Sequence, residues 1–179
     1  HGRRCVGYIG AEEYGPCFSY WRRQSTAQMT FEEQLRLTLE ADEGIIHEIY
    51  LCSENVPTFG IGHAITSDDA EYNLPVGTAI SESRVTSAFA QDMERCLKDA
   101  RWLVPQFDDM PQGAKVTIAS LSFQLGLPRY SKFAKHLAAL DKKPPDFTAA
   151  AAELRDSKLY RQTKNRTERH AQRLEQLVS

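Results

Sequence analysis

Residues 114–126 read AKVTIASLSFQLG and contain a single charged side chain. Folded as a helix, this segment would be apolar on nearly every side, and such a helix is stable only when other elements bury it. Gly126 and Pro128 are expected to end it. The chain must therefore build a helical core around the segment, and 179 residues, 41% of them hydrophobic, are enough for one ordinary domain with a sizeable core.

Amphipathic patterns supply the covering helices. Three follow the apolar segment, in YSKFAKHLAAL, FTAAAAELRD and NRTERHAQRLEQL. Another helix precedes it, because Thr30 and Glu33 form a capping box and Gly44 is a suitable stop just after Glu43. We expect these helices to form a bundle around residues 114–126.

A longer helix is expected from Ser81, as its N-terminal cap, to about Trp102. Its apolar stripe comprises Val85, Phe89, Met93 and Leu97, with Cys96 beside them. A helix of that length can join two lobes of a protein. Cys96 lies on the buried stripe and is expected to be a core residue.

Residues 45–66 are expected to form short strands. In TFGIGHAI, residues 58–65, bulky side chains alternate with small ones, so that an extended strand would have one bulky and one small face. Glycines in a strand often mark a place where a ligand approaches the backbone, although a plain tight turn in a hairpin also fits this pattern. Helices and short strands together predict an α+β fold in two lobes, a small sheet lobe joined by the long helix to a helical lobe.

The composition argues against several classes of protein. A net charge of −2 does not suggest binding to nucleic acid, and no apolar run approaches the roughly 18 residues that cross a membrane. The four cysteines, Cys5, Cys17, Cys52 and Cys96, are too few for a disulfide-based fold, and none forms the CxxC pair typical of a zinc site. A local disulfide between Cys5 and Cys17 stays open, because its formation depends on the redox compartment.

Residues 1–29 show no clear periodicity and are rich in Gly, Tyr and Arg, which predicts an irregular N-terminal arm followed by a domain over residues 30–179. Glu12 and Glu13 interrupt anything similar to the apolar core of a signal peptide. The sequence opens on His1 rather than methionine, which favours a processed or trimmed product or an excised part of a longer polypeptide.

Glu43, Cys52 and Thr58 are the residues that best indicate a chemistry. Cys52 lies in the turn-like stretch CSENVP, although an unmodified cysteine usually prefers a buried site. Glu43 lies at an expected helix C-terminus, where the negative end of the helix dipole disfavours an ionised carboxyl group. Hydrolysis of a glycosidic bond requires a carboxylic acid on one side of the bond, and on the other side a group that delivers water or attacks directly.

The segment EGIIHEIYLCSENVPTFGIGHAIT, residues 43–66, resembles the catalytic segment of the T4-type phage lysozymes, glycoside hydrolase family 24. The family's pattern is Glu, eight residues, Asp or Cys, five residues, Thr, and then a GIGH-like strand. LSFQLG and LYRQTKNRTER extend the resemblance to about residues 30–178. It implies a lysozyme-like fold with a small antiparallel sheet, and cleavage of the β-1,4 bond between N-acetylmuramic acid and N-acetylglucosamine in bacterial peptidoglycan, with no cofactor and no metal.

The resemblance also implies catalytic roles. Glu43 is the general acid, and Cys52 and Thr58 face it over the cleft, where the threonine hydroxyl helps to hold the attacking water. Arg166 matches an arginine that pairs with the catalytic glutamate and steadies the two lobes. Its positive charge favours the ionised carboxylate, against the effect of the helix end.

Further positions are implied to be structural or to contact substrate. His63 is expected to form a structural ion pair with Asp92 on the long helix. The implied substrate contacts are Ala64, Phe123, His136 and Glu153. At His136 and Glu153 the chain departs from the small or amide side chains usual there, and a short insertion around KKPPD lies between them. Phe123 fits a core position as well as a sugar platform.

Cys52 occupies the position where most such enzymes have aspartate. An unperturbed thiol is only a few per cent thiolate at neutral pH, so that it is a weak base unless its pKa is lowered. Cys52 is therefore a base, a neutral thiol that orients water, a nucleophile towards the sugar, or an incidental loop cysteine. A disulfide to Cys5 or Cys17 that blocks the active site until it is exchanged is a further hypothesis.

The leading hypothesis is a muramidase that acts on the bacterial cell wall. It fits an endolysin, made in the host cytoplasm, or a lysozyme of the virion tail, in which residues 1–29 would contact other tail proteins. The arm and the net charge favour the virion slightly, because tethering supplies the effective concentration that a free, weakly acidic enzyme lacks near a polyanionic wall. The alternative is a non-catalytic module, a lysozyme fold that serves as a tail structural or peptidoglycan-binding part.

Overall fold

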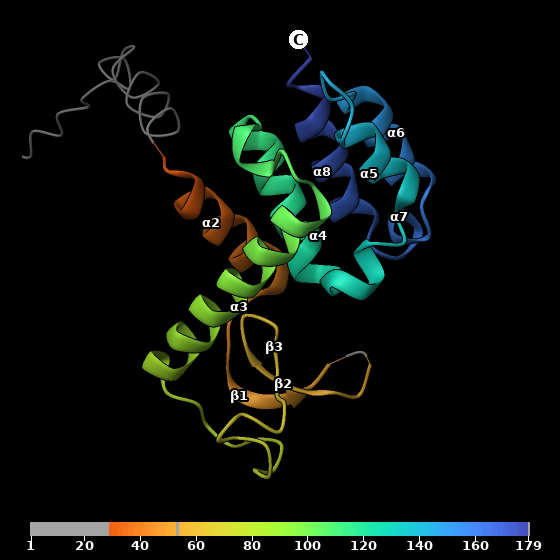
Figure 1. Cartoon of the computed structure of the whole chain (residues 1–179). Helices are drawn as coiled ribbons and strands as arrows, with labels where there is room; N and C mark the ends of the chain where they lie inside the picture. Colours follow the sequence, from red (N-terminus) through yellow and green to blue (C-terminus); the bar gives the residue numbers. More distant parts are fainter. Residues whose placement is uncertain (1–28, 53, 179) are drawn as a thin grey trace, which may run out of the picture. The chain divides into compact units, whose positions relative to one another are not determined.

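A computed structural model describes residues 29–52 and 54–178 (Figure 1). The described chain forms a three-stranded antiparallel sheet, ordered β1-β2-β3, and a larger set of helices. The strands are β1 (Ile46–Leu51), β2 (Pro57–Gly60) and β3 (His63–Ala64). The helices are α2 (Phe31–Glu43), α3 (Glu82–Leu103), α4 (Gln112–Tyr130), α5 (Ala134–Leu140), α6 (Phe147–Asp156), α7 (Lys158–Gln162) and α8 (Lys164–Glu175), with a short 3-10 helix at Phe107–Asp109. The predicted α+β fold is confirmed.

The ends of two helices follow the capping signals in the sequence. After Glu43, Gly44 adopts a left-handed conformation with φ 73°, and its N–H donates to the Glu40 carbonyl over 3.0 Å. A glycine takes this conformation without the strain that a side chain would cause. The hydroxyl of Ser81 accepts a hydrogen bond from the Arg84 N–H at 3.3 Å and so begins α3. The glycine stop thereby places Glu43 at the very end of α2.

Helix α3 runs from the sheet towards the other helices (Figure 1) and belongs to two hydrophobic cores. Its beginning contributes Val85 and Ala88 to a small core, whose other members are Ile49, Phe59, Ile65 and Ile80. Further along, Phe89 and Ala100 belong to a larger core built from the helices. The small core defines a sheet lobe and the large core a helical lobe, and α3 joins them, as the sequence predicted.

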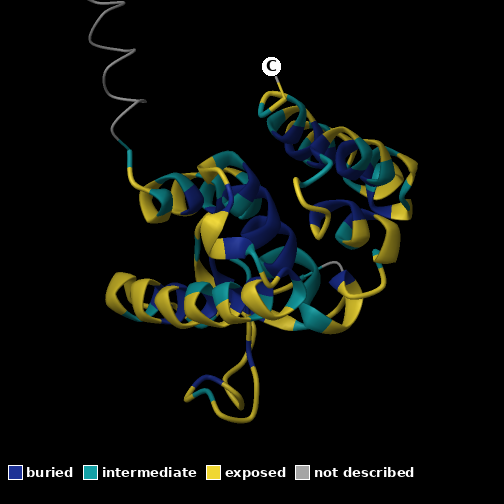
Figure 2. Ribbon diagram, turned by 45° about the horizontal axis from the view of Figure 1, so that its top comes forward, coloured by how far each residue is buried: buried dark blue, intermediate teal, exposed yellow. Residues whose placement is uncertain are grey.

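Helix α4 is the buried centre of the helical lobe. Its fully buried apolar residues are Ala114, Val116, Ile118, Ala119 and Leu121. In Figure 2 the buried residues gather inside the helical lobe, whereas α3 shows exposed residues along much of its length. The predicted stop at Gly126 is a kink rather than an end: Gly126 has φ 64° and ψ 165°, and a last turn continues to Tyr130. Pro128 permits this turn because its fixed φ suits the first positions of a helical segment.

Of the two structures that the sequence allowed for residues 58–65, the chain does not form one extended strand. β2 ends at Gly60, β3 begins at His63, and Ile61 and Gly62 form the turn between them. Gly60 and Gly62 both have positive φ, 64° and 70°, which reverses the chain. The alternative of a plain hairpin turn is therefore what the chain adopts. Phe59 and His63 pair across the hairpin and are both buried.

Several predictions concern residues that the structure does not describe. Cys5, Cys17 and nearly all of the predicted arm lie outside the described residues. The disulfide between these cysteines, the disulfide switch on Cys52 and the boundary at residue 30 therefore stay predictions. Among the described helices, none is both long and apolar enough to cross a membrane.

Candidate active site

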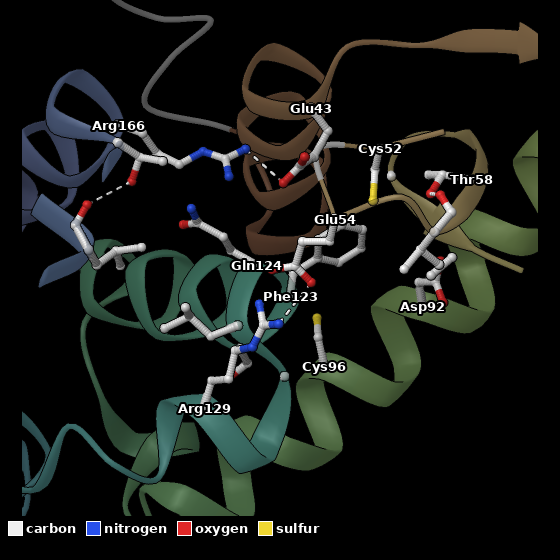
Figure 3. A pocket seen from close by; sticks show the side chains of 18 of the residues that line it. Glu43, Cys52, Glu54, Thr58, Asp92, Cys96, Phe123, Gln124, Arg129 and Arg166 are labelled. Carbon is white, nitrogen blue, oxygen red and sulfur yellow. Dashed lines mark hydrogen bonds and ion pairs between the residues drawn. The ribbon is translucent and has the colours of Figure 1, made fainter. Parts of the chain in front are cut away.

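A cleft of about 730 Å³ is lined by residues of both lobes. Glu43 enters it from the end of α2, Cys52 from the turn after β1, and Thr58 from β2 (Figure 3). The kinked end of α4, residues 122–126 and 129, forms another wall. The structure thus brings the three residues that were expected to be catalytic into one cleft.

Glu43 is bound by an arginine far along the chain. Arg166 Nη2 donates to Glu43 Oε1 over 2.7 Å (Figure 3). Arg166 Nε also lies 3.3 Å from Oδ2 of Asp42, whose side chain is 3% exposed, and Arg169 binds the other oxygen of Asp42. A buried carboxylate therefore holds the arginine in place, and the arginine in turn orients Glu43.

The second carboxylate oxygen of Glu43 lies beside the hairpin glycine Gly62. A β-carbon at Gly62 would stand 3.5 Å from Glu43 Oε2. Among the described residues, no hydrogen-bond donor to Oε2 is found. The absence of a side chain at Gly62 therefore leaves room for a ligand atom next to this oxygen.

Cys52 lies in a tight turn, is partly exposed, and forms no disulfide within the described part of the chain. Its N–H donates to the Val56 carbonyl over 3.0 Å, and the Asn55 N–H donates to the Cys52 carbonyl over 2.9 Å. The pKa of the thiol is lowered, mainly because the N–H groups of Glu54 and Val56 hydrogen-bond the sulfur. These effects outweigh burial and the charge of Glu54, which act in the opposite direction. The thiolate, which is the form that can accept a proton, is thus more populated near neutral pH than in a free cysteine.

Thr58 presents an oxygen rather than a proton to the cleft. The residue is 3% exposed, and its hydroxyl donates to the Val56 carbonyl over 2.9 Å. A hydroxyl has one proton, so that in this arrangement the oxygen can only accept further hydrogen bonds. Thr58 and Cys52 both line the cleft.

His63 lies between two carboxylates. Its Nδ1 is 2.8 Å from Asp92 and its Nε2 is 3.2 Å from Asp69, while Arg84 and Arg95 bind these same carboxylates from outside. Burial lowers the pKa of His63, but the hydrogen bonds and charges of Asp92 and then Asp69 raise it overall. The geometry matches the expected ion pair with Asp92 and adds Asp69 as a second partner.

Two of the four implied substrate contacts line the cleft. Ala64 is exposed on the hairpin, and Phe123 projects from α4 with its ring packed edge-on against Phe89 at 6.1 Å. Phe123 therefore packs against the core and also lines the cleft, and its role as a sugar platform stays a prediction.

The structure does not bring His136 and Glu153 to the cleft. Both line a separate pocket of about 420 Å³. His136 is 1% exposed, its Nδ1 bonds the Ala150 carbonyl at 2.9 Å and its Nε2 the Tyr130 hydroxyl at 3.0 Å, and burial lowers its pKa to about 4. The implied role of His136 is therefore corrected: this histidine is a neutral, buried link between α4, α5 and α6.

The cleft-lining residues that sequence reasoning missed include Tyr50, Glu54, Gln124 and Arg129. Burial, and then the charges of Glu43 and Cys52, raise the pKa of Tyr50. Arg129 Nη2 binds Glu54 Oε2 over 2.8 Å, across 75 residues of chain. No local pattern marks such a pair. Within the described residues, no three His, Cys, Asp or Glu side chains are placed to hold a metal ion.

Comparison with known proteins agrees with this geometry. The phage lysozyme family model matches residues 40–174, which include the whole cleft. "Probable T4-type lysozyme 2" of Dictyostelium discoideum is 28% identical, over 75% of this chain and 89% of that protein. "Pre-baseplate central spike protein Gp5" of Enterobacteria phage T4 is also 28% identical, over 79% of this chain but only 27% of the spike protein. The chain belongs to the phage lysozyme family.

Proposed function

We propose that this protein is a muramidase that hydrolyses the β-1,4 bond between N-acetylmuramic acid and N-acetylglucosamine in bacterial peptidoglycan. One observation carries the proposal: the cleft holds a glutamate that has a partner for only one of its carboxylate oxygens among the described residues, together with Cys52 and Thr58, whose sulfur and oxygen can accept hydrogen bonds from water. Membership of the phage lysozyme family supports it. A cleft of about 730 Å³ is also within the usual size range of ligand sites.

In the proposed reaction, Glu43 donates a proton from Oε2 to the glycosidic oxygen of the leaving sugar. Arg166 holds Oε1, so that the carboxyl group keeps its orientation, and the guanidinium stabilises the carboxylate that remains after proton transfer. The small residues Gly62 and Ala64 leave space for a sugar ring beside this carboxyl group, and Phe123 offers an apolar surface on another wall.

Water attacks the anomeric carbon in the second half of the proposed reaction. Thr58 Oγ1 accepts one hydrogen bond from this water, and the sulfur of Cys52 accepts the other. As the bond to the sugar forms, the thiolate takes the water proton, which its lowered pKa makes feasible near neutral pH. The thiolate thus performs the task that the family's aspartate performs elsewhere, and no covalent intermediate is needed.

The test is muramidase activity of wild type and Glu43→Gln on purified peptidoglycan. Clearing of turbidity measures hydrolysis, and borohydride reduction followed by mass spectrometry identifies the sugar at the new reducing ends. We expect reducing N-acetylmuramic acid from the wild type, and a loss of about 10²–10⁴-fold or more in Glu43→Gln, because an amide has no acidic proton to give. Glu40→Gln, on the same helix and paired with exposed Arg36, is the matched control and should retain activity.

A non-catalytic peptidoglycan-binding or tail structural module is the second candidate, favoured by the similarity to a protein named as a baseplate spike. Such a module would sediment with peptidoglycan and release no reducing ends. If Glu43→Gln retained the wild-type rate, the general acid would be assigned wrongly. For the biological setting we propose a phage protein that acts on the host cell wall, either as an endolysin or as part of the virion.

A further inference from the structure

An ion pair crosses the cleft close to the proposed water site. Arg129, on the last turn of α4, binds Glu54, two residues after Cys52 in the β1–β2 turn, over 2.8 Å (Figure 3). Both residues line the cleft, and their side chains are 58% and 56% exposed. An ion pair with this exposure contributes little to folding stability. A ligand that enters the cleft can therefore replace it at little cost.

The Arg129 guanidinium has N–H donors that Glu54 does not use. Glu54 accepts a hydrogen bond from Nη2, and within residues 29–52 and 54–178 no acceptor is found for Nε or Nη1. A guanidinium matches a carboxylate with two parallel hydrogen bonds, so that the single bond to Glu54 leaves its preferred geometry unfilled. The hydrogen bond from Arg129 also lowers the pKa of Glu54, which keeps that carboxylate ionised and available as a partner.

We propose that Arg129 binds a carboxylate of the substrate and that Glu54 takes the place of this carboxylate when the cleft is empty. The inference rests on the proposed muramidase function, because the peptide stems of peptidoglycan carry free carboxylates next to the muramic acid residue. When substrate binds, Arg129 exchanges one carboxylate for another and keeps its charge partner. The side chain of Glu54 is more than half exposed, so that its carboxylate can rotate into the solvent and leaves no uncompensated buried charge.

The two halves of the pair then have opposite effects on substrate binding. If the pair only braced the cleft, removal of either partner would break the same contact and change binding in the same direction. In the exchange mechanism Arg129 is a receptor for substrate and Glu54 is its competitor. Loss of Arg129 must therefore weaken binding, and loss of Glu54 must strengthen it.

The experiment compares Arg129→Gln and Glu54→Gln on soluble peptidoglycan fragments. The fragments are used with free stem carboxylates, and after these have been coupled to methylamine with carbodiimide. Arg101→Gln and Asp108→Asn are the matched controls, since they break an equally exposed ion pair that does not line the cleft and change the net charge by the same amounts. KM and kcat come from the release of reducing ends.

With free carboxylates we expect Arg129→Gln to raise KM about fivefold with kcat nearly unchanged, and Glu54→Gln to lower KM about two- to threefold. On amidated fragments the wild type should show the high KM of Arg129→Gln, and that variant should no longer differ from it. Arg129→Lys should restore part of the affinity, because it keeps the charge but not the planar fork.

Changes of the same sign in both variants, or equal changes in the control variants, would overturn the exchange mechanism. The dissociation constants of the same fragments, measured by calorimetry with each substitution combined with Glu43→Gln, test the inference without turnover. Opposite shifts in that assay support carboxylate binding by Arg129 even where the wild type cleaves nothing. Cleavage by the wild type without opposite shifts leaves the muramidase proposal intact and removes this one.

Discussion

Replacement of His63 by glutamine should destabilise the protein in a pH-dependent way. The imidazole ring is 6% exposed, and its partners Asp92 and Asp69 are 5% and 11% exposed. Removal of one partner from a buried ion pair costs about 3–5 kcal/mol, because the other charge stays buried. Arg84 and Arg95 still neutralise the two carboxylates, so that we expect the lower end, about 3 kcal/mol near pH 5.5. For a protein of this size that corresponds to a fall of about 6–12 °C in Tm.

The sign of the pH dependence follows from the raised pKa of His63. A histidine whose folded pKa exceeds its unfolded value of about 6.5 stabilises the fold fully below about pH 6.5. This contribution is lost as the pH rises through the folded pKa. Burial raises the pKa of Asp69, but hydrogen bonds from Thr66 and His63 lower it to about 2. The contribution of Asp69 to the stability of the fold is therefore present above about pH 3.8 and is lost towards pH 2. The difference between wild type and variant above pH 6 therefore reports His63.

Thermal unfolding followed by circular dichroism at about pH 5.5, 7 and 8.5 measures the effect. We expect the difference in Tm between wild type and His63→Gln to be largest near pH 5.5 and to shrink as the pH rises. His47→Gln, the same substitution at an exposed histidine of β1, should change Tm by less than about 2 °C at every pH. A difference that is constant or grows with pH, or a His63 ring that titrates below about pH 6.5 by NMR, would refute the reasoning.

The remaining predictions concern the cleft itself. Iodoacetamide near neutral pH should modify Cys52 well before Cys96, because backbone N–H groups lower the pKa of the Cys52 thiol. Burial, with the charges of Asp92 and Asp99, raises the pKa of the Cys96 thiol to about 12. Peptide mapping identifies the modified residue, and bound oligosaccharide should protect Cys52. Cys52→Ala should lose about 10²–10⁴-fold in rate while Cys52→Asp stays active, and full activity of the alanine variant would make the thiol incidental. Gly62→Val should lower both activity and stability, because φ is 70° there and a side chain would meet Glu43 at 3.5 Å; normal kinetics with normal Tm would contradict this.

Signals between near neighbours in the chain accounted for most of the elements. The capping residues Ser81 and Gly44, and the apolar period of α3 and α4, depend on contacts within one or two helical turns. Glu43, Cys52 and Thr58 were singled out through the resemblance to the T4-type phage lysozymes, which could be recognised because all three belong to one short segment. Such signals can be read from a single sequence because the interacting groups are close along the chain.

The conformation of residues 58–65 could not be predicted from such local signals. Alternation of bulky and small side chains fits a strand and a hairpin equally well, and the left-handed φ values of Gly60 and Gly62 decided between them. Glycine permits such angles without requiring them. The same holds for Gly126, where a kink and a stop have the same sequence signature.

The sequence by itself determined the α+β class, the bounds of α2 and α3 and the residues of the proposed acid and water site. Only the tertiary structure decided that His136 is a buried link and that Arg129 meets Glu54 across the cleft. Each of these depends on side chains that the fold brings together from separate elements. Their contact energies are set by distance and burial in space, and neither quantity is encoded by local spacing along the chain.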